Sequence, residues 1–215
     1  MSCLDGFGRV ASPLCPWCGL PLATWVEEDH YCENCLRRKP LYEWARAAYF
    51  YEGSVREAIH QLKFAGKSHL AGPLGELLAA ATEECLPDSH DDLVMPVPLH
   101  PRRLRERGFN QSLLLARQVA SRLGAELDYL SLRRVRYTKP QTSLKGEERR
   151  KNVRKAFGCT DRSLLKGGNV ILIDDVTTTG NTLNDCARAL KRAGAERVYG
   201  MALARTSPRA LRSGI

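Results

Sequence analysis

The stretch "ILIDDVTTTGNTL" (171–183) decides the fold class of this chain. Its apolar residues end abruptly in two acids, Asp174 and Asp175, and a run of threonines with one glycine leads into an amphipathic segment. The pattern predicts a buried strand over 169–174, a polar turn, and a helix over 181–194 that Gly194 closes. Ligands of open α/β sheets bind at the carboxyl ends of strands, so this turn is the first candidate for a binding site.

Strands and helices alternate along the rest of the chain. Strands are predicted at 44–53, which ends in a turn, at the start of 92–100, at 130–136 and at 197–204. Helices are predicted over 54–64, 67–85 and 110–123. Ser54 and Glu57 have the spacing of a capping box, and Asn110 can cap the third helix. The basic stretch 101–109 is predicted to be a loop, and 137–168 has no clear period. This order predicts a parallel sheet covered by helices on both faces.

The turn after Asp175 has the features of a phosphate site. Its backbone N–H groups, from Thr177 to Thr182, lead into a helix N-terminus, where unpaired N–H groups and the helix dipole favour an anion. Gly180 permits close approach of a ligand, and the threonine hydroxyls can donate to phosphate oxygens. The paired carboxylates can accept from vicinal hydroxyls such as those of ribose. Together these groups predict a pocket for a ribose 5-phosphate.

Other interpretations of the turn fit less well. The chain contains neither the G-x4-G-K-[ST] phosphate loop nor the G-x-G-x-x-G dinucleotide fingerprint. A phosphoacceptor aspartate of the response-regulator kind is expected near the start of its domain. A solvated turn without a ligand stays open, but it leaves two carboxylates beside a phosphate-binding backbone without a role.

The net charge of +9 comes from two segments. Residues 133–155 hold ten Lys or Arg and two Glu, a net of +8, and residues 101–107 hold four Arg and one Glu, a net of +3. Such segments suit a polyanionic partner, either a phosphorylated small molecule or nucleic acid. A solvated cationic face is the ordinary alternative.

Four cysteines form two Cys-x2-Cys pairs with thirteen residues between them: Cys15, Cys18, Cys32 and Cys35. Two such turns can direct four thiolates at one tetrahedral Zn²⁺, while Gly19 lets the backbone fold around the metal and point N–H groups at sulfur. Four thiolates fill the coordination sphere, so the metal is expected to be structural and to support a module over 1–40. A thiol–disulfide pair, a rubredoxin-like iron site and unliganded thiols remain alternatives.

The composition, 43% hydrophobic and 27% charged, is that of a soluble globular protein. The chain has no apolar run of about 18 residues that predicts a transmembrane helix. Its first ten residues lack the charged and apolar regions of a secretory signal. A cytoplasmic location is therefore expected, and cysteines in that compartment are not expected to form disulfides.

"VILIDDVTTTGNT" (170–182) resembles the motif that binds phosphoribosyl pyrophosphate (PRPP) in type I phosphoribosyltransferases, with Thr177 in place of the usual apolar residue. It follows the two cysteine pairs, "HQLKFAGK" (60–67), "PVPLHPRRLRERGFNQ" (96–111) and "TKPQTSLKGEERRKNVRKAF" (138–157), in the order of the ComF/GntX family of competence-associated proteins. The resemblance covers nearly the whole chain. It implies a type I phosphoribosyltransferase-like α/β domain over 41–215, preceded by a small zinc-binding module.

The resemblance also implies roles for individual residues. Asp174 and Asp175 would hold the ribose hydroxyls and stabilise an oxocarbenium-like state, which makes them the candidate catalytic residues. The loop 99–108 would hold pyrophosphate together with Mg²⁺, and a hood over 137–157 would close over the site. The candidate hood contacts, for PRPP or nucleic acid, are Arg149, Arg150 and Asn152. The candidate PRPP-binding residues are Leu99, His100, Arg103, Arg107, Gly108, Asp174, Asp175, Val176, Thr177, Thr178, Thr179, Gly180, Asn181 and Thr182.

Two functions of different classes follow. The first is an enzyme that passes ribose 5-phosphate to a nitrogenous acceptor and releases pyrophosphate. The second is a non-catalytic protein that senses PRPP and binds single-stranded DNA during natural transformation and DNA utilisation, with other competence or DNA-processing proteins as partners. The hood carries more charge than one pyrophosphate needs, which favours a longer anion, but only Tyr137 and Phe157 flank it as surfaces for base stacking.

Overall fold

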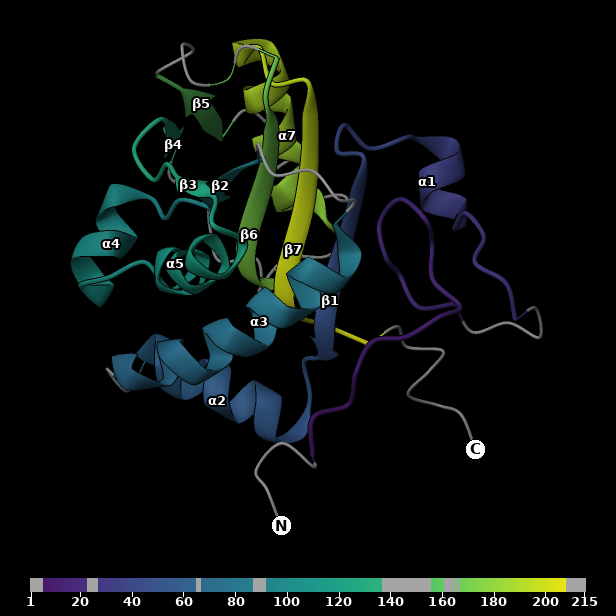
Figure 1. Cartoon of the computed structure of the whole chain (residues 1–215), viewed down its shortest axis with the longest axis horizontal. Coiled ribbons are helices and arrows are strands. Elements are labelled where there is room, and N and C mark those ends of the chain that lie inside the picture. The colour runs from purple at the N-terminus through teal and green to yellow at the C-terminus, as the bar shows by residue number, and fades with distance from the viewer. Residues whose placement is uncertain are drawn as a thin grey trace.

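A five-stranded parallel sheet forms the centre of the molecule, in the order β1-β7-β6-β2-β3 (Figure 1). The structure, a computed structural model, describes residues 6–22, 27–64, 67–86, 92–136, 156–160, 165 and 167–207. The strands of this sheet are β1 (Trp44–Phe50), β2 (Asp92–Pro96), β3 (Glu126–Leu127), β6 (Asn169–Thr177) and β7 (Arg197–Arg205). Two short strands, β4 (Leu132–Arg134) and β5 (Phe157–Cys159), pair with each other in antiparallel fashion. The predicted α/β class and parallel sheet are confirmed.

Helices cover both faces of the sheet (Figure 1). One face packs in a common apolar core against α2 (Gly53–Phe64), α3 (Ala71–Cys85) and α5 (Gln111–Leu123). The other face packs against α7 (Asn181–Ala193), together with β4 and β5. The shorter helices are α1 (Glu33–Arg37), the 3-10 helix η1 (Ser68–Leu70) and α4 (Pro101–Arg107). None of the helices in the described ranges combines the length and the apolarity needed to cross a membrane.

The predicted cap at Asn110 is confirmed, the predicted helix 67–85 begins as α3 only at Ala71 after η1, and the predicted capping box at Ser54 is not formed. Asn110 caps α5 by accepting from the N–H of Ser112 at 3.1 Å, and Gly124 ends α5 in the left-handed region with φ +63°. Pro73 lies in the first turn of α3, where its missing N–H costs nothing. The predicted capping box at Ser54 is wrong, because α2 already begins at Gly53 and the Ser54 hydroxyl instead donates to the Gly6 carbonyl at 3.4 Å.

The segment 6–22 runs along the outer edge of β1. Arg9 forms an antiparallel bridge with Tyr49. The N–H of Val10 donates to the carbonyl of Ala48 at 3.0 Å, and the N–H of Phe50 donates to the carbonyl of Gly8 at 2.8 Å. These bonds cover an edge strand that would otherwise expose its backbone groups. The division of the chain into modules after residue 40 stays a prediction.

Candidate functional site

The acid pair lies inside a strand rather than after one. β6 extends to Thr177, so the prediction that the strand ends at Asp174 is wrong. The strand is longer because β7 runs alongside it, with Asp174 opposite Ala202 and Thr177 opposite Arg205. On its other side, β6 pairs with β2 only as far as Ile173. The acids therefore lie where one neighbouring strand has ended and side chains from other elements can reach them.

Side chains from α5 and α2 contact the acids on that side. Ser112 Oγ donates to Asp174 Oδ1 at 3.1 Å, and Gln111 Nε2 donates to Asp175 Oδ1 at 3.1 Å. Lys63, near the end of α2, forms an ion pair with Asp175. Asp174 is 8% exposed and Asp175 4%, so both carboxylates are held by protein groups.

The surroundings of the two acids drive their pKa values apart. Burial raises the pKa of Asp174 to about 8, and the charge on Asp175 adds to the rise while Lys63 opposes it. Burial also disfavours the charged form of Asp175, but the Lys63 ammonium and the hydrogen bond from Gln111 outweigh it and hold the pKa of Asp175 below its ordinary value. Near neutral pH the pair therefore carries about one negative charge rather than two.

The threonine run crosses from β6 into α7, as the pattern predicts. The candidate residues are divided among three places: Val176 and Thr177 end β6, Thr178, Thr179 and Gly180 form the turn, and Asn181 and Thr182 begin α7. Gly180 is the N-cap with φ +70°, and as a glycine it has no side chain to cap the helix. The first bond within α7 runs from the N–H of Asn184 to the carbonyl of Gly180 at 2.9 Å. N–H groups of a first turn have no acceptor within their helix, so this end of α7 is suited to an anion.

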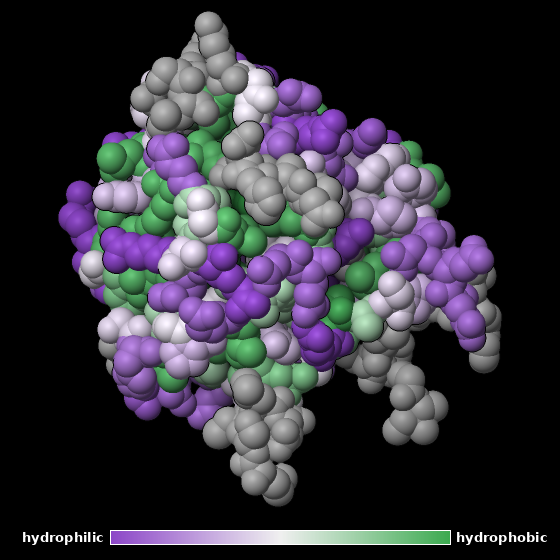
Figure 2. Space-filling model, in the orientation of Figure 1, coloured by the Kyte–Doolittle hydropathy of each residue, from purple (hydrophilic) through white to green (hydrophobic). Residues whose placement is uncertain are grey.

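The basic stretch predicted to be a loop is a helix, α4. Pro101 occupies its first turn, Nδ1 of His100 accepts from the N–H of Arg102 at 3.2 Å, and Gly108 ends the helix with φ +83°. These are ordinary start and stop signals, but the density of arginines hid the helical pattern. His100 is thus an N-cap, and the half-buried Leu99 lies just before the helix. Hydrophilic residues dominate the surface over α4 (Figure 2).

α4 connects the predicted pyrophosphate region to the acid pair through Arg107. Its guanidinium donates to Gln111 Oε1 at 2.5 Å and lies over the ring of Phe64, 5.0 Å from the centroid. Gln111 in turn donates to Asp175, so three side chains form a continuous polar chain. Burial lowers the pKa of Arg107, Asp175 opposes that shift, and the charge on Arg103 adds to it. Arg107 therefore places positive charge near Asp175, and Arg103 lies near enough to Arg107 for their charges to interact.

Three residues of this site are missing from the predicted set: Lys63, Gln111 and Ser112. Gln111 and Ser112 follow the N-cap of α5 directly, and Gln111 closes the stretch 96–111, so their place beside a site could have been inferred. Lys63 lies within the stretch 60–67. No spacing relates it to an acid more than a hundred residues later, and only the packing of α2 beside β6 brings the two together.

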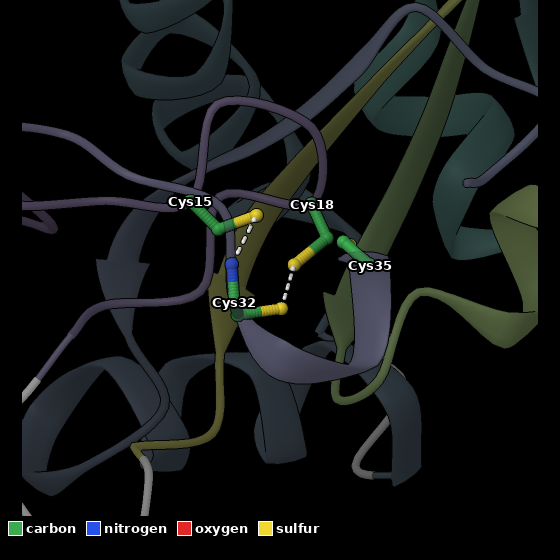
Figure 3. A group of neighbouring side chains, drawn as sticks. All are labelled: Cys15, Cys18, Cys32 and Cys35. Atoms are coloured by element: carbon green, nitrogen blue, oxygen red, sulfur yellow. Dashed lines mark hydrogen bonds between the residues drawn. The ribbon is translucent and has the colours of Figure 1, made fainter. Parts of the chain in front are cut away.

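The four cysteines converge on one point, as predicted (Figure 3). Their Sγ atoms all lie within 4.8 Å of one another, and those of Cys18 and Cys32 are 3.7 Å apart. The N–H of Cys32 donates to Cys15 Sγ at 3.4 Å. Gly19 completes the first turn with φ +63°, where a Cβ would lie 2.4 Å from the carbonyl oxygen of Ala45. The cluster is therefore fixed against β1 on one side.

This set of donors fits a tetrahedral metal. Ligands ~2.3 Å from Zn²⁺ are about 3.8 Å apart in a tetrahedron, close to the 3.7 Å between the sulfurs of Cys18 and Cys32. Burial and the neighbouring Cys15 raise the pKa of Cys18 to about 12. Burial opposes ionisation of Cys15 as well, but N–H groups of Cys18, Cys32 and Trp17 outweigh it and lower that pKa to about 7. Four such thiolates need a cation between them, and the cluster can hold zinc.

The candidate hood residues Arg149, Arg150 and Asn152 lie outside the described residues, and their role stays a prediction. Both ends of the hood are described. β4 precedes it and β5 overlaps its end, and the two strands pair with Leu132 opposite Cys159 and Arg134 opposite Phe157. The segment therefore leaves and returns at one place, on the α7 side of the sheet.

Comparison with known proteins gives one family and several relatives. The profile of the phosphoribosyl transferase domain matches residues 110–212, which include the acid pair and the turn before α7. DNA utilization protein YhgH of Salmonella typhimurium is 36% identical over 200 residues, or 90% of this chain and 84% of that protein. Competence protein F of Haemophilus influenzae is 30% identical over 90% of this chain and 85% of its own length. Competence protein ComFC of Bacillus subtilis is 29% identical over 90% and 78%.

Proposed function

Because this chain belongs to the ComF family of competence and DNA utilization proteins, which carry a phosphoribosyltransferase domain, we propose that it binds PRPP at the carboxyl end of β6. One observation carries the proposal. Within residues 174–182, two carboxylates, a turn rich in hydroxyls and the N-terminus of α7 follow one another. These are acceptors for two sugar hydroxyls and donors for a phosphate, in the order that a ribose 5-phosphate requires.

The 5-phosphate would lie against the first turn of α7. Thr179 is exposed and Thr178 and Thr182 are half-buried, so their hydroxyls are near the surface where a ligand can arrive. Gly180, with φ +70°, lets the chain turn sharply from β6 into the first turn of α7. The N–H groups and dipole of the helix favour the negative charge.

The ribose hydroxyls would replace protein partners on the acids. Asp175 now accepts from Gln111 and pairs with Lys63, and a hydroxyl donor would take over one of its oxygens. Lys63 would then face the diphosphate of PRPP, so its partly buried ammonium would exchange one anionic partner for another. Arg107, whose charge interacts with Asp175, would share that diphosphate, and Arg103 would add to the positive charge around Arg107.

We further propose that the site transfers ribose 5-phosphate from PRPP to an acceptor. The single negative charge of the Asp174–Asp175 pair would stabilise positive charge on the ring as pyrophosphate departs from the anomeric carbon. Lys63 and Arg107 would stabilise the departing anion. The diphosphate would carry Mg²⁺, since in such sites this ion is held mainly by substrate phosphates with one or two carboxylates. A nitrogenous base would be the acceptor of the ribose 5-phosphate. Away from this reaction, the four cysteines would hold one structural Zn²⁺.

Titration calorimetry with PRPP and Mg²⁺ tests the site. Asp175→Asn removes the charge that receives a sugar hydroxyl, and we expect the dissociation constant to rise at least tenfold with an unchanged circular dichroism spectrum. Glu126→Gln is the matched control, because Glu126 is an exposed carboxylate opposite Leu93 near the start of β2, away from the carboxyl end of β6. Equal affinities of the wild type and Asp175→Asn would refute the assignment.

Binding of single-stranded DNA is the second candidate function. The names of the relatives, DNA utilization protein and competence protein, and the net charge of +8 over residues 133–155 favour it. Anion binding by many lysines and arginines weakens steeply with salt. We expect fluorescently labelled single-stranded oligonucleotides to bind at 50 mM salt and to bind at least tenfold more weakly at 200 mM. Binding that does not change with salt, or no binding at either concentration, would contradict this function.

A further inference from the structure

Arg205, the last residue of β7, is buried more completely than is usual for an arginine. It is 2% exposed. Its Nη1 donates to the carbonyl oxygens of Cys18, at 3.1 Å, and Gly19, and its Nη2 donates to the carbonyl oxygen of Thr178 at 3.5 Å. All three acceptors are backbone carbonyls, and in the described parts of the chain no carboxylate forms an ion pair with this guanidinium.

These acceptors belong to two distant parts of the sequence. Cys18 and Gly19 form the first turn of the cysteine cluster, and Thr178 begins the turn between β6 and α7. The next residue after the arginine reinforces the second contact, because the N–H of Thr206 donates to the carbonyl of Thr177 at 3.2 Å. One buried side chain thus joins the cysteine turn to the turn proposed to hold phosphate.

Tyr42 makes a second connection between the same two places. It is 3% exposed and belongs to the apolar cluster against which Cys18 packs. Its hydroxyl oxygen lies 2.7 Å from the position that a Cβ on Gly180 would take. The tyrosine therefore fills the space between the cysteine turn and the N-cap of α7.

With Zn²⁺ bound, the cysteine cluster would also supply negative charge to compensate the buried guanidinium of Arg205. A buried guanidinium without a compensating charge is costly. Four thiolates around one Zn²⁺ carry a net charge of two negative units, and the Cys18–Gly19 turn places that charge beside the guanidinium. A metal also fixes the turn that presents the two carbonyls. A cluster without metal loses both effects, so the guanidinium loses the anchor from which it reaches Thr178.

We propose that Arg205 is a positioning residue that couples metal binding at the four cysteines to the order of the β6–α7 turn, and so to the affinity of that turn for a phosphate group. The affinity part rests on the proposed function. The coupling itself does not, because the order of the turn can be measured without any ligand.

Hydrogen–deuterium exchange on the full-length protein measures the coupling directly. We expect peptides covering residues 178–186 to exchange faster after zinc is removed with a chelator, and zinc-loaded Arg205→Met to exchange as fast as the metal-free wild type. Residues 169–173 in the centre of β6 serve as the internal reference and should keep their protection. Unchanged exchange over 178–186 would overturn the proposal, and so would an equal rise over 169–173, which indicates general unfolding.

Arg46→Met is the matched control for the arginine. Arg46 donates to the carbonyl of Pro16 at 3.0 Å, so it also holds the cysteine turn, and its other hydrogen bond goes to the carbonyl of Ala45 rather than to the β6–α7 turn. With zinc content measured in each sample, we expect Arg46→Met to retain slow exchange over 178–186. Fast exchange in this variant would mean that any loosening of the cysteine turn suffices and would overturn the specific role of Arg205. If Arg205→Met does not fold, the comparison of wild type with and without zinc still decides the coupling.

PRPP titration separates this inference from the proposed function. We expect the zinc-loaded wild type to bind PRPP at least tenfold more tightly than either the metal-free protein or Arg205→Met. A zinc-loaded wild type that fails to bind PRPP would refute the proposed function, while the exchange experiment would still decide the coupling. Equal PRPP affinity with and without zinc would overturn the link between the order of the turn and its affinity for phosphate, and would leave the proposed function intact.

Discussion

At the scale of single residues, Asp174 and Asp175 are neighbours in one strand whose carboxyl groups behave in opposite ways. Burial raises the pKa of Asp174 to about 8, while Lys63 holds the pKa of Asp175 below its ordinary value despite burial. Lys63 is therefore the group that gives the two acids different protonation states at neutral pH. One acid is a fixed anion, and the other can donate or accept a hydrogen bond at neutral pH.

The raised pKa of Asp174 predicts how the free energy of unfolding changes with pH. Asp174 has a folded-state pKa above its unfolded value of about 3.9, so its contribution to stability is full below that pH and is lost as pH rises through about 8. Asp174→Asn cannot ionise, so we expect its stability relative to wild type to rise with pH, by at most about 1.4 kcal/mol per pH unit. Urea unfolding at pH 5, 7 and 9 measures this change.

Asp175→Asn supplies the opposite case. Its depressed pKa means that the charged carboxylate stabilises the fold above the unfolded pKa and that this contribution is lost as pH falls through the folded value. In urea unfolding, the stability gap between the wild type and Asp175→Asn should therefore shrink as pH falls below the unfolded value of about 3.9. Parallel pH profiles for the two variants would contradict the unequal roles of the acids.

The roles of the site residues were predictable where those residues lie close together in the sequence. The four cysteines and the acid pair stand out because close spacing in sequence brings them together in space. The partners of the acids were not predictable in the same way. Lys63 and Gln111 reach Asp175 from two separate helices, and that contact depends on how the helices pack on the sheet.

At the scale of elements, the junction from β6 to α7 depends on one glycine. Gly180 adopts φ +70° as the N-cap, and a Cβ there would meet the hydroxyl of the buried Tyr42 at 2.7 Å. The junction therefore combines a backbone conformation and a close contact that only glycine satisfies.

Gly180→Ala should destabilise the protein by about 1–3 kcal/mol from the backbone strain, with a further loss from the contact with Tyr42. Gly124→Ala is the control, because Gly124 has φ +63° and nothing lies within 4 Å of the position that a Cβ there would take. We expect Gly180→Ala to lose more stability than Gly124→Ala in urea unfolding. Equal losses would mean that Tyr42 does not restrict the turn.

Sequence patterns predicted most elements but failed at two places that matter for the site, the end of β6 and the helix α4. The apolar and amphipathic periods of β6 and α7 are strong, and both elements lie where expected. The length of β6 was underestimated because polar residues 174–177 still pair with β7, which a single strand's hydropathy does not reveal. α4 was missed because its signals are two caps and a proline around a run of charge rather than an apolar face.

At the scale of the whole molecule, residues 6–22, which include the first cysteine pair, contact both the edge of the sheet and a side chain buried in the interior. Residues 6–22 pair with β1 along Gly8, Val10 and Trp17, and they provide two acceptors for the buried Arg205. Residues around the first cysteine pair therefore share contacts with the sheet, while the division of the chain after residue 40 stays a prediction. This sharing could not be predicted, because nothing in the pattern of residues 1–40 indicates which strand they cover.

Deleting residues 1–40 should accordingly cost more than the loss of a separate module. The truncated chain would expose the backbone edge of β1 and leave Arg205 without two carbonyl partners, at a cost of about 3 kcal/mol or more. We expect a lower urea midpoint and self-association in light scattering. A monomeric truncated chain of full stability would show that the modules are independent.

A crystal structure of the zinc-loaded protein soaked with PRPP and Mg²⁺ tests the PRPP site most directly. We expect density for the 5-phosphate at the first turn of α7, against residues 178–182, with the ribose hydroxyls on Asp174 and Asp175 and with Lys63 moved from Asp175 toward the diphosphate. Density for PRPP at any other place, with the ion pair between Lys63 and Asp175 intact, would contradict the assignment of this site.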